Sequence, residues 1–264
     1  MPRLPERIVC LSEEYTEILY HLGEEDRIVG ITEYTCRPPR AAEEKEQVSQ
    51  FLRADTGRIE ELAPDLVLGF SDLQADLAAD LIRRGLNVAV FNQRSVADIL
   101  AVVEATARLV GRDEDGRRYA DELAAGVARI QEAAAALPRR PRTYFEEWPK
   151  PCITAIGWVA ELVEIAGGEE LFPEHRGGVH AQDRTTDWDI VRAREPELML
   201  ASWCGARFNP RKVRERPGWD ELACVRDDRL VEIPSEIILQ PGPAALTDGL
   251  AAIHAAVAAA ARRE

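Results

Sequence analysis

Cysteine, positive charge and long apolar runs are all scarce in this chain of 264 residues. The cysteines are odd in number and form no CxxC pair, which indicates reduced thiols rather than a disulfide framework. They are Cys10, Cys36, Cys152, Cys204 and Cys224. No stretch approaches the roughly 18 apolar residues of a membrane-spanning helix, so we expect no membrane insertion. The opening MPRLPERIVCLSEEY lacks the apolar core of a secretory signal, which predicts a cytoplasmic location as written, or a periplasmic or surface-anchored one if the true start lies upstream.

Basic residues are outnumbered, with 33 Lys and Arg against 47 Asp and Glu, which gives a formal net charge of -14 at pH 7. Binding to nucleic acid or to an anionic membrane depends on a basic face that replaces counterions. The charge balance therefore excludes nucleic acid as an expected partner and favours a neutral or cationic ligand.

Common catalytic and nucleotide-binding motifs are also missing: the chain has no GxGxxG after a strand, no GxxxxGK[ST], no HExxH and no GxSxG. His175 and His180 share the loop PEHRGGVH, where a solvated role is the ordinary one. Glu146 and Glu147 in YFEEWPKP have the chemistry of a general acid and base, but neighbours on a strand point to opposite sides. We expect one of them to face the space between two lobes and the other to face water. No catalytic residue, catalytic cofactor or metal site is predicted.

Short apolar, β-branched runs alternate with amphipathic helical stretches, the pattern of a parallel sheet covered by helices. The expected strands are residues 7–11, 27–31, 66–69 and 88–91, then 142–145, 198–201 and 229–233. Between the two groups, residues 113–137 carry one apolar stripe at helical spacing, formed by Tyr119, Leu123, Val127, Ile130, Ala134 and Leu137. The pattern predicts an α/β protein with two Rossmann-like lobes, residues 1–112 and 138–264, joined by one long helix, residues 113–137.

The two lobes also resemble each other. IEELAPDLVLG (residues 59–69) matches VRAREPELMLA (191–201), and TEILYHLG (16–23) is echoed by AELVEIAG (160–167). Each member of the first pair predicts a short helix stopped by proline and followed by a buried strand. Two matches in the same order indicate one lobe plan used twice.

Aromatic residues cluster just after the expected strands or at the start of the following helices; they are Tyr15, Tyr34, Phe70, Trp148, Trp158 and Trp203. In parallel sheets this is the carboxyl edge, where ligands bind. About half of such residues are expected simply to pack in a core. The others would form a flat apolar clamp suited to a large planar ligand.

Taken together, RIVCLSEEYTEILYHLG, TEYTCRPP, RIEELAPDLVLGF, RGLNVAVF, the long helix and AELVEIAGGEELF resemble the helix-linked (class III) substrate-binding proteins of ABC importers. The resemblance covers nearly the whole chain and is closest to the members that bind vitamin B12 or iron chelates. It implies the class III periplasmic-binding-protein fold and a ligand held between the lobes.

Carried over to this chain, the resemblance nominates ligand contacts on three loops of the first lobe: Ser12, Glu13, Tyr15, Tyr34, Cys36, Arg37 and Phe70. Trp148, Trp158 and Trp203 join them chiefly through the edge argument. Asp76 falls where members present an acid that docks on a permease. The matching part of the second lobe, GARFNPRKVRERPGW, is basic instead, with Arg207, Arg211, Lys212, Arg214 and Arg216, so docking on permease arginines would be repulsive there.

The leading hypothesis is a non-catalytic, monomeric protein that holds a cobalamin-like corrinoid, with Cys36 or Cys204 as a less expected cobalt ligand. An iron siderophore or haem is the first alternative and would require Arg37, Arg207 and Arg211 to face the ligand. An enzyme acting on a tetrapyrrole or a metal is the second, and it would require His175, His180 or Glu146 to converge. The prolines of ITEYTCRPPRA (residues 31–41) predict a stiff strap that presents Tyr34.

Overall fold

The computed structural model describes residues 4–262, and the chain divides into two compact units. Unit 1 comprises Met1–Gln93, Ala97–Leu123 and Gln240–Pro243. Unit 2 comprises Arg94–Val96, Ala124–Leu239 and Ala244–Glu264. Each unit therefore includes a short segment that is distant in sequence from the rest of that unit. The division expected from the sequence, into three consecutive segments, does not have this feature.

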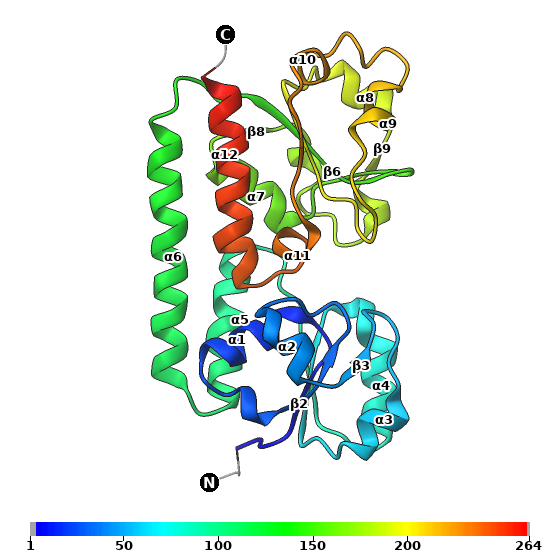
Figure 1. Cartoon of the computed structure of the whole chain (residues 1–264), viewed down its shortest axis with the longest axis vertical. Coiled ribbons are helices and arrows are strands. Elements are labelled where there is room, and N and C mark those ends of the chain that lie inside the picture. Colours follow the sequence, from blue (N-terminus) through cyan, green and yellow to red (C-terminus); the bar gives the residue numbers. More distant parts are fainter. Residues whose placement is uncertain (1–3, 263–264) are drawn as a thin grey trace. The chain divides into compact units, whose positions relative to one another are not determined.

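Unit 1 is built on a five-stranded sheet, sheet A, with strand order β3-β2-β1-β4-β5 and every neighbouring pair parallel (Figure 1). The strands are β1 (Ile8–Cys10), β2 (Ile28–Thr32), β3 (Gln47–Ser49), β4 (Leu66–Phe70) and β5 (Val88–Phe91). The helices between and after them are α1 (Glu13–His21), η1 (Glu25–Arg27), α2 (Pro39–Glu44), α3 (Thr56–Glu61), η2 (Asp72–Gln74), α4 (Ala75–Arg83) and α5 (Val96–Leu109). The four strands expected in this lobe are confirmed, and β3 is an addition.

Unit 2 has a six-stranded sheet, sheet B, of order β11-β10-β6-β7-β9 with β8 also paired to β6. Its strands are β6 (Arg142–Pro149), β7 (Cys152–Thr154), β8 (Glu169–Glu170), β9 (Thr185–Thr186), β10 (Leu198–Ala201) and β11 (Leu230–Glu232). The parallel pairing expected in this lobe is present among β6, β8, β10 and β11, but β7 runs antiparallel to both β6 and β9, so sheet B as a whole is mixed. The cause is that β6 does not stop at residue 145 but runs on to Pro149 and turns back through Lys150 and Pro151.

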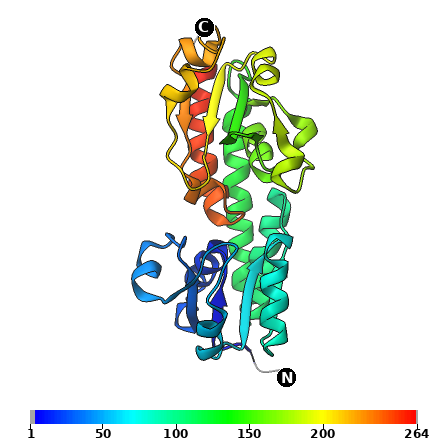
Figure 2. The same ribbon diagram turned by 90° about the vertical axis from the view of Figure 1, so that its right-hand side faces the viewer.

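The long helix expected between the lobes is α6 (Asp113–Ala135). The helices of unit 2 are α7 (Gly157–Ile165), η3 (Pro173–His175), η4 (Ala181–Arg184), α8 (Trp188–Ala193), α9 (Pro210–Arg214), α10 (Ala223–Arg226), α11 (Ser235–Ile238), η5 (Ala245–Gly249) and α12 (Leu250–Ala261). Helix α12, red in Figures 1 and 2, packs against α7 and β10. Across residues 4–262 no helix is both long and apolar enough to cross a membrane.

The repeated lobe plan is visible in the backbone. Helices α3 and α8 are each followed, two residues after their last residue, by a non-glycine residue with positive φ directly before a proline: Ala63 (46°) and Glu195 (47°). Helices α1 and α7 each end two residues before a left-handed glycine, Gly23 (70°) and Gly167 (95°). Because these special conformations recur at matching sites, the internal similarity read from the sequence is structural.

Candidate functional site

The carboxyl edge of sheet A carries the loop residues that the sequence nominates. Tyr34 follows β2 and is 49% exposed, although Thr35 beside it is buried. Its loop closes with the Thr35 N–H on the Thr32 carbonyl (3.0 Å), and Pro39 begins α2. The short turn between a buried strand and a proline-started helix presents the Tyr34 ring outward, as the stiff strap predicts.

Two further residues of this loop are only partly exposed. Cys36 is not part of a disulfide within the described residues. The Arg37 guanidinium lies 3.2 Å (Nε to Oε1) from Glu17 on α1, so much of its charge is balanced within unit 1. This arrangement makes Arg37 a support of the loop and weakens it as a site for an anionic ligand.

Exposed apolar side chains follow β3 and β4 as well. Phe51 and Phe70 stack obliquely with their ring centroids 6.2 Å apart, and Phe70 itself is buried. The Gln74 side chain ties these loops together, accepting from the Phe70 N–H (2.9 Å) and donating to the Phe51 carbonyl (2.7 Å). Leu52 and Leu73 are 60% and 46% exposed. We call Tyr34, Leu52 and Leu73 the apolar rim of unit 1.

The first turn of α1, directly after β1, contains two acids of unusual basicity. Burial raises the pKa of Glu14 to about 8 and that of Glu13 to about 7. Glu14 accepts from the Ser12 hydroxyl and from the Gln93 side-chain amide (3.0 Å). Sequence reasoning nominated Ser12 and Glu13 but missed Glu14, for which the only signal was its place in the pair EE.

Tyr15, Trp158 and Trp203 are packed inside their own units rather than standing on a surface. The Tyr15 hydroxyl donates to the Gly69 carbonyl (2.7 Å), and the Trp158 indole N–H donates to the Ile238 carbonyl (2.9 Å). Trp203 is 4% exposed. Since buried aromatic groups with satisfied donors are ordinary core residues, this geometry favours a structural role for Tyr15 and Trp158. Trp148 is partly buried at the end of β6, with its N–H on the Lys150 carbonyl (2.9 Å).

Unit 2 contains a buried charge pair, which we call the Glu146–Arg216 pair. Arg216 donates two hydrogen bonds to the Glu146 carboxylate (2.7 and 2.8 Å), and both side chains are almost fully buried. The same carboxylate accepts from the Tyr144 hydroxyl and from the Trp203 indole N–H, each at 3.0 Å. The expectation that Glu146 or Glu147 faces a space between lobes is wrong for Glu146, which lies in the core of its own unit.

Its neighbour Glu147 lies where the pairing of β6 with β7 is irregular, and it has different partners. It pairs with buried Arg184 (2.6 Å), whose guanidinium also donates to the Thr154 carbonyl.

The basic stretch expected at the docking surface of unit 2 is only partly on the surface. Arg211, Lys212 and Arg214 are exposed, but Arg216 is buried. The matching acid of unit 1, Asp76, is exposed near the start of α4.

A hollow of about 380 Å³ lies at the carboxyl edge of sheet B, lined by residues that follow β10 and β11. Its lining residues are Ser202, Trp203, Gly205, Ala206, Arg207, Glu232, Ile233, Pro234, Ser235 and Glu236. We call it the β10–β11 hollow. Its charged groups are two carboxylates and one guanidinium, so it is not a basic pocket.

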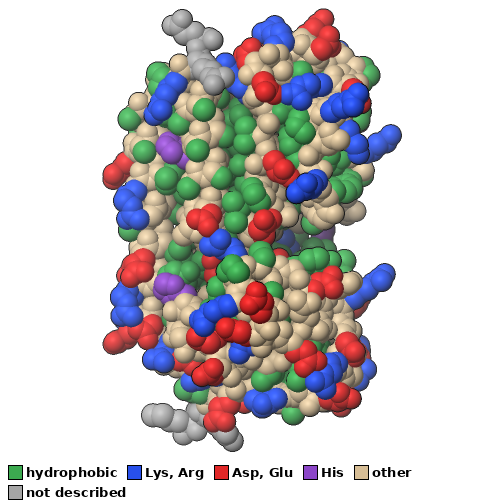
Figure 3. Space-filling model, in the orientation of Figure 1, with side chains coloured by type: hydrophobic (Ala, Val, Ile, Leu, Met, Phe, Trp, Pro, Cys, Tyr) green, Lys and Arg blue, Asp and Glu red, His purple; other side chains and the backbone are tan. Residues whose placement is uncertain are grey.

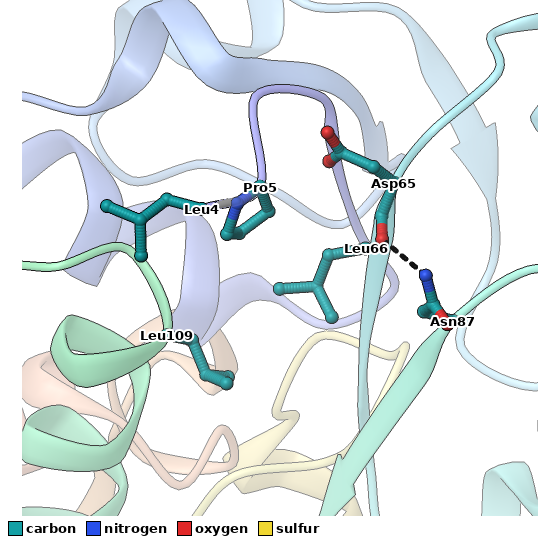
Figure 4. A pocket seen from close by; sticks show the side chains of 6 residues that line it. All are labelled: Leu4, Pro5, Asp65, Leu66, Asn87 and Leu109. Carbon is teal, nitrogen blue, oxygen red and sulfur yellow. Dashed lines mark hydrogen bonds between the residues drawn. The ribbon is translucent and has the colours of Figure 1, made fainter. Parts of the chain in front are cut away.

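Two other hollows lie away from these residues. Figure 4 shows one of about 330 Å³ in unit 1, between Leu4, Leu66 and Leu109, where Asn87 donates to the Asp65 carbonyl (3.1 Å). It sits where β4 begins, the amino edge of sheet A, opposite the edge at which parallel sheets bind ligands. Another, of about 710 Å³, lies in unit 2 between the β6–β7 turn and the start of α8.

Within residues 4–262 no three His, Cys, Asp or Glu side chains are grouped closely enough to hold a metal ion. His175 Nδ1 lies 3.0 Å from the Thr154 hydroxyl, and His180 caps η4, so the two loop histidines serve local structure. On the face in Figure 3 acidic and basic side chains are interspersed, without a basic field.

Comparison with known proteins agrees with this geometry. A family model described as periplasmic binding protein matches residues 8–237. An uncharacterized ABC transporter substrate-binding lipoprotein of Bacillus subtilis (strain 168) is 23% identical over 248 residues, which are 90% of this chain and 76% of the relative. The solved periplasmic vitamin B12 binding protein of Vibrio cholerae has a TM-score of 0.79 at 22% identity, covering 99% of this chain and 100% of the other. A periplasmic heme-binding protein from Roseiflexus sp. RS-1 gives 0.81 at 23%, covering 96% and 99%.

Proposed function

Because this chain belongs to the periplasmic binding protein family, we propose that it is the substrate-binding component of an ABC importer and that its ligand is a neutral, cobalamin-like corrinoid. The class III fold, inferred from the sequence, is shared with the two solved structures above. We infer the identity of the ligand from the side chains at the carboxyl edges of the two sheets.

The observation that carries the ligand choice is the charge of those edges. A siderophore or a haem with its propionates is anionic and needs cations to balance it, whereas a corrinoid presents amides on a large flat ring. Of the three arginines that would mark an anion site, Arg37 is paired with Glu17 and Arg211 with Glu215 (3.1 Å). The third, Arg207, shares the β10–β11 hollow with Glu232 and Glu236.

The apolar rim supplies the complementary surface. Tyr34, Leu52 and Leu73 expose flat or branched apolar groups just after β2, β3 and β4, at the carboxyl edge of one parallel sheet, where a ring can rest without displacing a charge. An exposed apolar surface of this kind favours an uncharged planar ligand.

An anionic iron chelate, siderophore or haem, is the second candidate, and Arg207 in the β10–β11 hollow is the feature that favours it. A catalytic role has less support, because Glu146 is buried and balanced by Arg216 while His175 bonds to Thr154. We therefore propose a non-catalytic monomer. Since the similar proteins are described as periplasmic or as a lipoprotein, we also propose that it works outside the cytoplasmic membrane, in place of the location expected from its first residues.

Calorimetric titration with hydroxocobalamin, haemin and a ferric siderophore tests the ligand directly. We expect hydroxocobalamin to bind more tightly than either anion, and preference for an anion would reverse the assignment. Tyr34→Ala should weaken binding by about 1–2 kcal/mol, roughly tenfold, because it removes an aromatic contact without touching the core. Ile82→Ala is the matched control: Ile82 is 57% exposed at the end of α4 away from the rim, so affinity should be unchanged.

A further inference from the structure

The Glu146–Arg216 pair has no equivalent in unit 1, although the two units share one plan. In sheet B, β6 pairs with β10 so that Thr143 faces Leu198 and Glu146 faces Ala201. In sheet A, Ile8 on β1 faces Leu66 on β4, and the Asp65 N–H bonds the Arg7 carbonyl just as the Glu197 N–H bonds the Arg142 carbonyl. Counting along the strands, the residue of unit 1 that matches Glu146 is Leu11.

Leu11 is fully buried in the apolar core of unit 1. The lobe plan therefore folds with a leucine at this position, and a carboxylate is not needed for the strand itself. A buried ion pair is also a weak source of stability, because removing both charges from water costs about as much as their attraction returns. The stability of the fold therefore does not explain why unit 2 has Glu146 at this position.

What the carboxylate holds is Trp203. Glu146 Oε1 accepts both the Trp203 indole N–H (3.0 Å) and one Arg216 N–H (2.7 Å), so the indole is oriented by an acceptor that is itself fixed. Phe208 meets the Trp203 ring edge-on, with centroids 5.1 Å apart. Trp203 is also one of the residues that line the β10–β11 hollow.

Arg216 is suited to this task in a way that lysine is not. Its guanidinium lies 4.6 Å from the Trp188 ring centroid and 4.4 Å from that of Trp219, so its flat faces stack on aromatic rings while its edge reaches the carboxylate. A planar group held in this way fixes both oxygens of Glu146, whereas an ammonium would hold the carboxylate at a single point.

We propose that Glu146 and Arg216 are positioning residues: the pair fixes the orientation of Trp203 so that the β10–β11 hollow keeps the shape that its ligand requires. The proposal rests on the proposed function for the claim that this hollow contacts the ligand. The positioning itself is a property of unit 2 without ligand, and the two parts are tested separately.

The main variant replaces both charges at once, Glu146→Leu with Arg216→Met, so that no unpaired charge stays in the core. The protein is labelled with 5-fluorotryptophan, and the ¹⁹F resonance of Trp203 is assigned by its loss in Trp203→Phe. We expect the Trp203 resonance to move or broaden and the affinity for hydroxocobalamin to fall at least tenfold. The matched control, Glu147→Leu with Arg184→Met, removes the neighbouring, partly buried pair, which bonds Thr154 and not Trp203, and should leave both readouts unchanged.

An unchanged Trp203 resonance, or an affinity within twofold of the wild type, overturns the proposal. If the wild type binds none of the three ligands, the proposed function fails, and the ¹⁹F readout alone still decides whether the pair positions Trp203. If the double variant does not fold, Arg216→Lys replaces it: the charge is kept, and a Trp203 resonance identical to the wild type again counts against the positioning role.

Discussion

The two units carry the same strand and helix plan but fill one matching core position in opposite ways, with Leu11 in unit 1 and Glu146 in unit 2. The apolar choice needs no partner. The charged choice recruits Arg216 from a loop 70 residues away, together with Tyr144 and Trp203. The fold therefore tolerates an apolar residue at this position, and we attribute the charge in unit 2 to the positioning of Trp203.

A second contrast concerns the partners of the buried acid in each unit. Glu146 accepts two hydrogen bonds from a guanidinium, whereas the partners of Glu14 in unit 1 are the neutral Ser12 hydroxyl and Gln93 amide. Burial accordingly raises the pKa of Glu14 to about 8. Unit 1 therefore carries a group that changes charge near neutral pH.

The largest effect should come from moving the acid of unit 2 into unit 1. Leu11→Glu places a carboxylate in an apolar core without a guanidinium partner, and it should lower the free energy of unfolding of unit 1 by on the order of 5 kcal/mol. All five tryptophans belong to unit 2, so circular dichroism should show the loss while tryptophan fluorescence lags behind it. Leu11→Met should cost little, and equal losses in both variants would refute the contrast.

The next effect comes from breaking the pair in unit 2. Arg216→Ala leaves the Glu146 carboxylate buried without its cation, which should cost about 3–5 kcal/mol in urea unfolding followed by tryptophan fluorescence. Arg211→Ala is the surface comparison: Arg211 is paired with Glu215 but is exposed, so the loss should be negligible. A cost below about 1 kcal/mol for Arg216→Ala would mean that the pair is not integral to the core.

The third effect depends on pH and on unit 1. Because the folded-state pKa of Glu14 is raised to about 8, the folded unit holds a proton that the unfolded chain releases near pH 4.5. The stabilisation that this proton gives the folded unit is therefore fully present below pH 4.5 and is lost as the pH rises through 8. Glu14→Gln should flatten this dependence and raise the free energy of unfolding at pH 8 by roughly 2–4 kcal/mol. Unfolding by urea at pH 5 and pH 8 measures it, and an unchanged slope would contradict the assignment.

The smallest effect should be the same in both units. Ala63 and Glu195 hold positive φ directly before a proline, and glycine adopts that conformation without steric cost. Ala63→Gly and Glu195→Gly should each stabilise its unit by about 0.5–1 kcal/mol in urea unfolding. Gains that differ in sign between the two would show that the shared backbone feature is not energetically equivalent.

Much of the fold could be read from the sequence, because the seven predicted strands each have three or more apolar or β-branched residues between clear turn signals. Strands β5 and β10 were predicted with the observed bounds, and α6 ended only two residues early. The strands that were missed, β3, β7, β8 and β9, have two or three residues each and little periodicity. The hairpin of β6 and β7 was hidden because WPKP reads as a loop.

The site was harder to predict because its polar contacts are long-range. Tyr34 and its exposed loop followed from local signals, a strand end and two prolines. Burial of Glu146 depends on Arg216, and the orientation of Trp203 depends on Glu146, 57 residues away. No local motif marks partners that are so far apart in sequence. The pattern YFEEWPKP therefore predicts a strand end, with one glutamate facing solvent and the other facing a space between lobes.

The segment Gln240–Pro243 has a consequence for the order in which the protein is made. It completes unit 1: the Gln93 amide donates to the Pro241 carbonyl (3.3 Å), and Gly242 packs so closely on Glu14 that a methyl group would not fit. The rest of unit 1 ends at Leu123, so a ribosome adding 5–20 residues per second takes roughly 10 s more to supply this segment. Until then unit 1 lacks the segment that covers Glu14, so the nascent chain completes unit 1 only after residues 124–239 of unit 2 have been made.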